Sequence, residues 1–385
     1  MTSIKISREQ ARRFLINRQT FRAYGPKFSG QAGVGDAIRH LGAVQIDPIN
    51  VFERNHHHAL FCRVEGYRPE MLEHELYTAK SSFEYFANAL CILPMEDYPY
   101  FAYSMRQHQQ EYTMEPEVAK AAAHILDRLE SEGPLGSRHF ASVERISGFW
   151  DSQNVLSTKV EKKALDILHY VGKVMISGRM GMQRTYDLPE RIVPLGLMNR
   201  DVSLSDYRDF IFMKFLNAYG LSQSSLFRFG WLDGAKKKHL SSLIDAGSVT
   251  EVEIGGVKRK YYCPSALLPE LEATILPEVQ QAVFVAPLDN LAWDRDRLLD
   301  IFEFDYRWEV YTPEVKRKYG YYVLPILYDN SFVGRIELKA LRDKGQLKIM
   351  NMWLDKATPD VRDAIRQTIE DIAQYLNLKV GSISC

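Results

Sequence analysis

The stretch KVMISGRMGMQRTYDL, residues 173–188, decides the fold, because apolar and polar residues alternate along it as in two strands joined at a glycine-containing turn. The residues before it have helical spacing. VAKAAAHILDRLES at 118–131 predicts an amphipathic helix that a Gly-Pro pair breaks, residues 135–141 a short helix, and residues 158–169 a longer one. Helices followed by a hairpin are the order of a winged-helix module, a relative of the helix-turn-helix that commonly places one helix in a DNA groove.

The same order of elements returns in residues 204–264. We expect a long apolar helix at 204–220, a second helix at 233–247, and then a hairpin whose turn is Gly255-Gly256. The helix before each hairpin carries lysines, which are Lys159, Lys162 and Lys163 in the first copy and Lys236, Lys237 and Lys238 in the second. Two copies of one plan therefore predict tandem winged-helix modules.

The two ends of the chain differ from this plan. Residues 4–24 predict an opening helix, with Ser7 as its N-cap and Gln10 three residues later. A glycine-rich loop and a short helix at 36–41 should follow. From about residue 281, apolar and aromatic runs separated by turns predict an antiparallel β domain, and a last amphipathic helix at 359–376 should pack against it.

Composition limits the class of protein. The 385 residues are too many for one ordinary core, and 46% hydrophobic with 25% charged residues is typical of a folded globular chain. The net charge is 0, yet residues 65–132 hold 13 Asp or Glu against 5 Lys or Arg, a net of −8, so the remainder carries +8. This asymmetry suits a protein that binds an anionic polymer, although a patchwork of solvated faces would give it too.

Neither a membrane span nor a covalent or metal framework is predicted. No apolar run reaches the roughly 18 residues that cross a bilayer, and the first residues lack a secretory signal, so we expect a cytoplasmic protein. The four cysteines are scattered without a CxxC pair, which predicts free thiols rather than a zinc site or disulfides.

The segment AVQIDPIN, residues 43–50, holds the strongest candidate for chemistry. In an extended backbone, side chains alternate between two faces, so Gln45 and Asp47 would share one face while Val44 and Ile46 take the other. A carboxamide beside a carboxylate can hold and activate a water molecule. From spacing alone, the alternative is an Asp47 that only caps the turn before the following proline.

The segment VQIDPIN resembles the QxD motif of the AlkZ/YcaQ family of winged-helix DNA glycosylases, in its YcaQ-like branch. Further resemblance covers nearly the whole chain: residues 59–64, which we expect to form an apolar strand ending in an arginine, 172–191 in the middle module, and 293–339 in the C-terminal domain. The chain departs from the family pattern at Leu288-Asp289, where Phe-Asp is common, and at Glu337, where Asp is common.

The resemblance implies an α+β fold with three winged-helix modules before a β-rich C-terminal domain. The expected parts are a first, irregular module with the QxD motif at 1–115, a second at 116–200, a third at 201–278, and the C-terminal domain with its terminal helix at 279–385.

It also implies Gln45 and Asp47 as the catalytic pair of a monofunctional glycosylase that removes cationic alkylated purines, such as N7-alkylguanine and N3-alkyladenine, including interstrand crosslinks. A cationic purine leaves as a neutral base, so the acid that glycoside hydrolysis ordinarily needs becomes dispensable. Asp47 can then activate water while Gln45 positions the water or the sugar. No cofactor is expected.

The expected partner is double-stranded DNA carrying alkylated or crosslinked purines, bound by a monomer in the nucleoid. The residues expected to contact it are Asn50, Arg54, His56, Arg63, Lys163, Arg179, Arg184, Lys316, Arg317 and Arg335. We expect the run His56 to His58 to lie in a strand, where consecutive side chains face opposite ways and cannot share a metal easily. Residues 316–322 alternate basic and aromatic side chains, which suits phosphate contacts and base stacking, although a charged turn before a strand would look the same.

Two other classes of protein fit part of the pattern. A non-enzymatic winged-helix transcriptional regulator would explain the lysines but not the QxD pair, and an interaction scaffold would have no affinity for DNA. Release of a methylated base from duplex DNA separates the enzyme from both alternatives.

Overall fold

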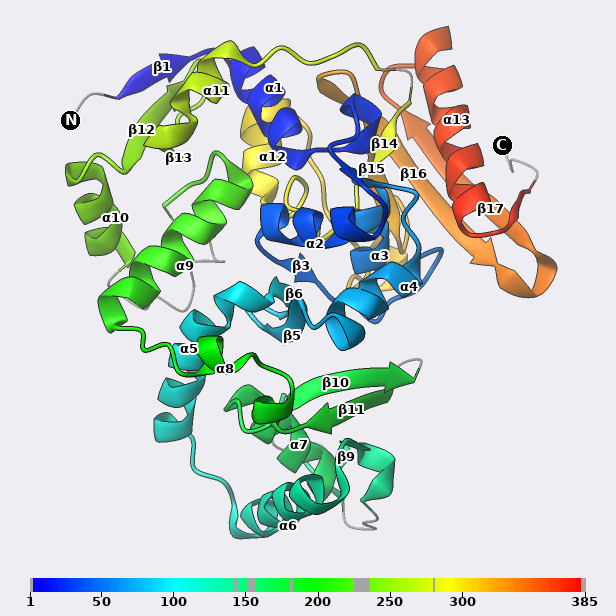
Figure 1. The fold of residues 1–385 in the computed structure, drawn as a ribbon. Coiled ribbons are helices and arrows are strands. Elements are labelled where there is room, and N and C mark those ends of the chain that lie inside the picture. Colours follow the sequence, from blue (N-terminus) through cyan, green and yellow to red (C-terminus); the bar gives the residue numbers. More distant parts are fainter. Residues whose placement is uncertain are drawn as a thin grey trace. The chain divides into compact units, whose positions relative to one another are not determined.

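A computed structural model describes residues 3–140, 145–150, 157–180, 183–224, 236–279 and 281–381. The chain forms two compact units, one from Met1–Met71 with Phe212–Cys385 and the other from Leu72–Ile211 (Figure 1). Both units contain helices and sheets, so the fold is α+β, as the sequence predicted. Within the described residues, no helix is long and apolar enough to cross a membrane.

The second unit contains the winged-helix module that residues 173–188 predicted. Helices α6 (Pro116–Glu132) and α7 (Val160–Tyr170) precede the hairpin of β10 (Met175–Met180) and β11 (Gln183–Asp187). Strand β7 (Leu135–Gly136) pairs with β11 and completes a three-stranded sheet. A 3-10 turn at Ser137–His139 stands where we expected a short helix. Residues 181–182 of the predicted turn lie outside the described part.

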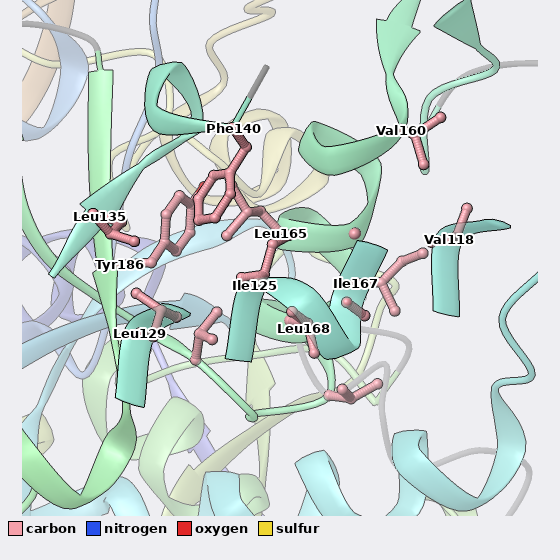
Figure 2. Packing of buried hydrophobic residues seen from close by; sticks show 14 of the residues in the cluster. Val118, Ile125, Leu129, Leu135, Phe140, Val160, Leu165, Ile167, Leu168 and Tyr186 are labelled. Atoms are coloured by element: carbon pink, nitrogen blue, oxygen red, sulfur yellow. The ribbon is translucent and has the colours of Figure 1, made fainter. Parts of the chain in front are cut away.

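Apolar side chains of this module form one core between the two helices and the sheet (Figure 2). Ile125 and Leu129 of α6 contribute buried side chains, as do Leu165 and Leu168 of α7 and Tyr186 of β11. The helical spacing of the first four residues and the strand position of Tyr186 bring them to one side of each element. The helical spacing of residues 118–131 and 158–169 and the alternation in residues 173–188 therefore place apolar side chains in one shared core.

The second copy lies mostly in the first unit, since the boundary between the two units at Ile211 and Phe212 falls within its first helix. Helices α9 (Leu204–Tyr219) and α10 (Lys236–Asp245) precede the hairpin of β12 (Val249–Ile254) and β13 (Tyr261–Pro264). Ser222 forms a bridge to Tyr262 in β13, which corresponds to the pairing of β7 with β11 in the other module. Residues 233–235, where we expected the second helix to begin, lie outside the described part. An unexpected strand, β1 (Ile4–Ile6), adds to β12 in parallel.

The N-terminal segment confirms one prediction and corrects another. Helix α1 (Arg8–Gln19) has the capping box of Ser7 and Gln10 that we expected. Helix α2 (Gly30–Leu41) begins six residues before the predicted position, so part of the expected loop is helical. Its buried stripe includes Gly33, where a Cβ would lie 3.0 Å from the backbone of Phe28. Close packing thus explains a glycine in a helix.

Helix α3 (Asn55–Phe61) stands where we expected strands. We had predicted a strand at the three histidines and another at residues 59–64. Six of its seven side chains are buried, and this burial outweighs the low helix propensity of histidine and asparagine. Only Val64–Glu65 (β4) is a strand, and it pairs with β2 (Phe28–Ser29).

The predicted C-terminal β domain is present as a five-stranded sheet in the order β14-β15-β16-β17-β18, which is antiparallel as expected except that β18 pairs in parallel with β17. Its strands are Val283–Phe284, Val323–Tyr328, Ser331–Leu341, Gln346–Leu354 and Lys379–Val380. Helix α13 (Pro359–Tyr375) lies against β14, where Thr368 donates a 2.8 Å hydrogen bond to the carbonyl of Ala282 (Figure 1). The predicted terminal helix is confirmed.

The remaining elements are short or connect these modules. They are β3 (Val44–Gln45), α4 (Pro69–Glu73), β5 (Ser82–Phe86), β6 (Leu90–Pro94), α5 (Tyr98–Glu111), β8 (Arg145–Ile146), β9 (Thr158–Lys159), α8 (Leu195–Met198), α11 (Leu268–Ala273) and α12 (Arg295–Phe302).

Candidate active site

The QxD segment leaves helix α2 at Gly42, forms the two-residue strand β3, and continues without regular structure to Asn50. The Asp47 side chain is buried, with 7% of the residue exposed. Its Oδ1 accepts a 2.8 Å hydrogen bond from the backbone N–H of Ile49. One carboxylate oxygen therefore caps the turn, as the alternative interpretation had it. Among the described residues, nothing donates a hydrogen bond to the other oxygen, Oδ2.

Burial raises the pKa of Asp47 above its ordinary value, and the hydrogen bond from Ile49 opposes this only in part. A carboxylate with a raised pKa is a stronger base once it is ionised, since its conjugate acid holds the proton more tightly. The environment of Asp47 therefore suits proton abstraction from water better than an exposed aspartate would.

Asn55, at the start of α3, fixes the backbone beside the motif. Its Nδ2 donates to the carbonyl of Gln45 at 3.1 Å, and its Oδ1 accepts from the backbone N–H of Leu288 at 3.1 Å. The side chain is buried, so both bonds lie away from water. Sequence reasoning missed this residue because its two partners are 10 and 233 positions away.

The segment after the motif is held by the C-terminal sheet. The carbonyl of Val51 accepts a 3.0 Å hydrogen bond from the N–H of Ala340 in β16. Arg342 donates to the carbonyl of Phe52 at 2.7 Å and reaches Asn50 Oδ1 at 3.4 Å. The loop that carries Asp47 is thus braced by residues nearly 300 positions away in the chain.

The prediction that Arg63 contacts DNA is wrong. Its side chain is fully buried and forms two hydrogen bonds with the carboxylate of Asp289, at 2.7 and 3.0 Å. It also donates to the carbonyls of Gln19 and Ala59. With no exposed surface, Arg63 braces the core around α3, and Asp289 is its counter-ion.

Two of the three histidines of α3, His56 and His58, are buried, and His57 is half-buried. His57 Nδ1 lies 2.8 Å from the hydroxyl of Tyr67, and His58 Nε2 lies 2.6 Å from the carbonyl of Phe284. Burial lowers the pKa of both to about 4, so both are neutral at pH 7. His56 exposes only 7% of its surface, which leaves little for the predicted DNA contact. Among the described residues, no group of His, Cys, Asp or Glu could hold a metal ion.

Two further predicted DNA contacts, Lys163 and Arg335, are corrected because both residues are buried, while Arg179 is half-buried and its charge is already paired. Lys163 is buried and pairs with Glu115 at 2.8 Å. Arg179 pairs with Glu84, which is itself buried. The guanidinium of Arg335 is buried and lies between aromatic rings, 4.1 Å from the ring centre of Phe304 and 4.5 Å from that of Tyr319.

The other predicted contacts keep surface for a ligand. Asn50 and Lys316 are exposed, while Arg54 and Arg317 are partly exposed. Arg184 is also partly exposed and lies 4.0 Å from Asp166. Of these five, the structure brings Asn50 and Arg317 together as walls of one groove.

Two carboxylates shape the basic loop at 316–322. Glu309 accepts hydrogen bonds from the backbone N–H groups of Lys318, Tyr319 and Gly320, at 2.8 to 3.2 Å. Burial opposes its ionisation, but these bonds outweigh burial and lower the pKa of Glu309. Glu337 accepts hydrogen bonds from the backbone N–H groups of Tyr321 and Tyr322. A Cβ on Gly320 would lie 2.6 Å from the carboxylate of Glu337. The loop therefore has a fixed shape.

The groove runs between this loop and the strands β16 and β17. Polar, aromatic and charged side chains line it, among them Asn50, Arg317, Tyr319, Tyr321, Lys339 and Asn351. Asn50 is three residues beyond Asp47 in the chain, so the groove and the candidate catalytic carboxylate belong to the same region of the first unit.

Two comparisons with known proteins bear on the family and the fold of the chain. A family model described as "DNA glycosylase AlkZ-like" matches residues 38–375, a span that includes Gln45 and Asp47. A solved structure, the Streptomyces sahachiroi DNA glycosylase AlkZ, has a similar fold, with a TM-score of 0.64 and 18% identity. The similarity covers 98% of this chain and 100% of that one.

Proposed function

Since the chain belongs to the AlkZ-like DNA glycosylase family, we propose that it hydrolyses the N-glycosidic bond of N7-alkylguanine and N3-alkyladenine. The family makes the chain a DNA glycosylase rather than a non-enzymatic regulator. Asp47 is the general base in this proposal and Gln45 positions the water or the deoxyribose. The observation that carries it is the state of Asp47: buried, with Oδ1 held by Ile49 and Oδ2 without a donor among the described residues.

The chemistry of the substrate fits a site with one acting carboxylate. An alkylated purine carries a positive charge, so it departs as a neutral base without being protonated by an acid. The sugar becomes oxocarbenium-like in the transition state, and a negative charge near it is stabilising. Asp47 can supply that charge and take a proton from water in the same step.

The proposed partner is duplex DNA bound by a monomer. We assign the DNA contacts to polar and basic residues that are exposed or partly exposed. In the first unit these residues are Asn50, Arg54, Lys316 and Arg317, and in the second unit the residue is Arg184. Phosphate contacts of this kind position the duplex without reading its sequence. Damage can occur in any sequence, so such contacts suit a repair enzyme.

We further propose that interstrand crosslinks through N7 of guanine are substrates. A crosslinked guanine stays tethered to the opposite strand, so an enzyme that requires full base flipping rejects it. The groove beside the QxD segment is open, and Asn50 at its edge is exposed, which supports access without a closed base pocket.

The test is base release from duplexes that differ only in the lesion. Matched oligonucleotides carry N7-methylguanine, a nitrogen-mustard crosslink or no damage, and free base and abasic sites are measured. We expect release from the first two and none from the third. If the methylated base is not released, the proposed substrate class is wrong; if only the crosslink stays intact, the crosslink proposal alone fails.

A further inference from the structure

Tyr311 is the most exposed aromatic side chain near the candidate catalytic residue. It exposes 81% of its surface and sits at the tip of a turn that the 2.8 Å hydrogen bond from Thr312 N–H to the carbonyl of Glu309 closes. Arg317 holds the far side of this turn through a 2.8 Å bond to the carbonyl of Thr312. An exposed aromatic ring on a fixed turn can stack on a ligand that reaches it.

A chain of edge-to-face rings connects Tyr311 to the QxD segment. Tyr311 contacts Trp308 with ring centres 5.8 Å apart, Trp308 contacts Tyr322 at 5.9 Å, and Tyr322 contacts Phe52 at 6.1 Å. Phe52 is five residues beyond Asp47. Partial desolvation and, after it, the charge of Asp47 raise the pKa of Tyr311, which agrees with the two groups being neighbours.

Two neighbouring tyrosine rings already have a cation over them. Arg317 lies 5.0 Å from the ring centre of Tyr321, and Arg335 lies 4.5 Å from that of Tyr319, with Lys318 at 5.0 Å from the same ring. Within the part of the chain that the structure describes, no cation lies over Tyr311. Its exposed ring is therefore available to a cationic ligand.

We propose that Tyr311 recognises the alkylated base by stacking on its positively charged ring. This rests on the proposed substrate class, since only an alkylated purine brings a delocalised cation to the site. A cation over a tyrosine face is attracted by the negative charge of the ring's face. A normal purine is neutral and gains only ordinary stacking, so the contact selects damage over undamaged DNA.

The contact acts on binding rather than on bond cleavage. As the glycosidic bond breaks, positive charge moves from the base to the sugar, so attraction between Tyr311 and the base weakens in the transition state. An interaction that is stronger in the ground state than in the transition state lowers KM and also lowers kcat. Loss of the ring should therefore raise KM without lowering kcat, whereas a defect in the QxD pair lowers kcat.

The experiment compares two duplexes of the same shape and different charge. One carries N7-methylguanine on a 2′-fluoroarabinose sugar, which resists cleavage, and the other carries neutral 7-methyl-7-deazaguanine on the same sugar. We expect the wild-type protein to prefer the charged duplex by about 2- to 30-fold. Tyr311→Ala should bring the preference close to 1, and Tyr311→Phe should keep most of it.

Tyr328→Ala is the matched control, because this partly exposed tyrosine lies outside the groove and its loss should leave the charge preference in place. Since Tyr311 is exposed, Tyr311→Ala and Tyr311→Phe should unfold at nearly the wild-type temperature. A wild-type protein without a charge preference, or a Tyr311→Ala protein that keeps it, overturns the assignment. Release of N7-methylguanine from a natural sugar tests the proposed function separately, because binding to the uncleavable pair is measurable whether or not excision occurs.

Discussion

Replacement of Asp47 by asparagine is the sharpest test of the catalytic assignment. Asparagine has the same shape and keeps an oxygen that accepts the hydrogen bond from Ile49, so the turn should persist. What disappears is the charge and the basicity at Oδ2. A positioned general base contributes about 10²- to 10⁴-fold, or about 3 to 5 kcal/mol of barrier. Because Asp47 is buried, bulk water cannot easily replace it, and we expect a loss in the upper half of that range.

The assay is single-turnover excision of N7-methylguanine, with binding to the same duplex measured in parallel. Affinity should change little, since the substitution adds no bulk and removes a charge that repels phosphates. Asp343→Asn makes the same change at an exposed position of the first unit and should leave the rate unaltered. If Asp47→Asn excises at close to the wild-type rate, Asp47 is not the base and the free Oδ2 has no catalytic meaning.

Three other predictions follow from the described geometry. The single-turnover rate should rise with pH to a plateau, because Asp47 acts ionised, with a midpoint above the ordinary aspartate pKa of 3.8 since burial raises it; a midpoint at or below that value contradicts the desolvated base. Arg63→Met should lower the free energy of unfolding by about 3 to 5 kcal/mol, because Asp289 is left as an unpaired buried charge, and denaturant unfolding measures this; a loss below 1 kcal/mol, as for a surface residue, refutes the bracing role. The pKa of His57 and His58 is about 4 in the folded protein and 6.5 in the unfolded chain, so the unfolded chain binds more protons between these two pH values. The free energy of unfolding should therefore fall as the pH drops from about 6.5 to 4. A free energy of unfolding that stays constant in that window contradicts the burial of these two rings.

The sequence predicted the modules better than the residues that connect them. The hairpins and the helices before them follow from local periodicity, which one core per module enforces. Helix α3 was missed because three consecutive histidines have no helical pattern, and only burial against distant segments explains their conformation. Tertiary context overrode propensity there.

The site was predictable where the motif is contiguous and unpredictable where it depends on distant partners. Gln45 and Asp47 are two positions apart, so they form a short motif that the resemblance to the family could identify, and their catalytic role stays a prediction. Arg63 was misassigned because a lone arginine in a sequence looks like a phosphate contact, whereas its counter-ion Asp289 lies 226 positions away. The same distance hid Asn55, whose partner Leu288 is equally remote.

The discontinuity of the first unit has a consequence for synthesis of the protein on the ribosome. Residues Leu72–Ile211 form a unit of contiguous sequence, so they can fold as soon as they emerge. The segment with Gln45 and Asp47 emerges earlier but must wait for Leu288, Ala340 and Arg342 before its backbone is held. At about 5 to 20 residues per second, that delay lasts on the order of tens of seconds. Chains released before residue 342 would carry the complete QxD motif without the contacts that hold its backbone, so we expect such fragments to lack base-excision activity.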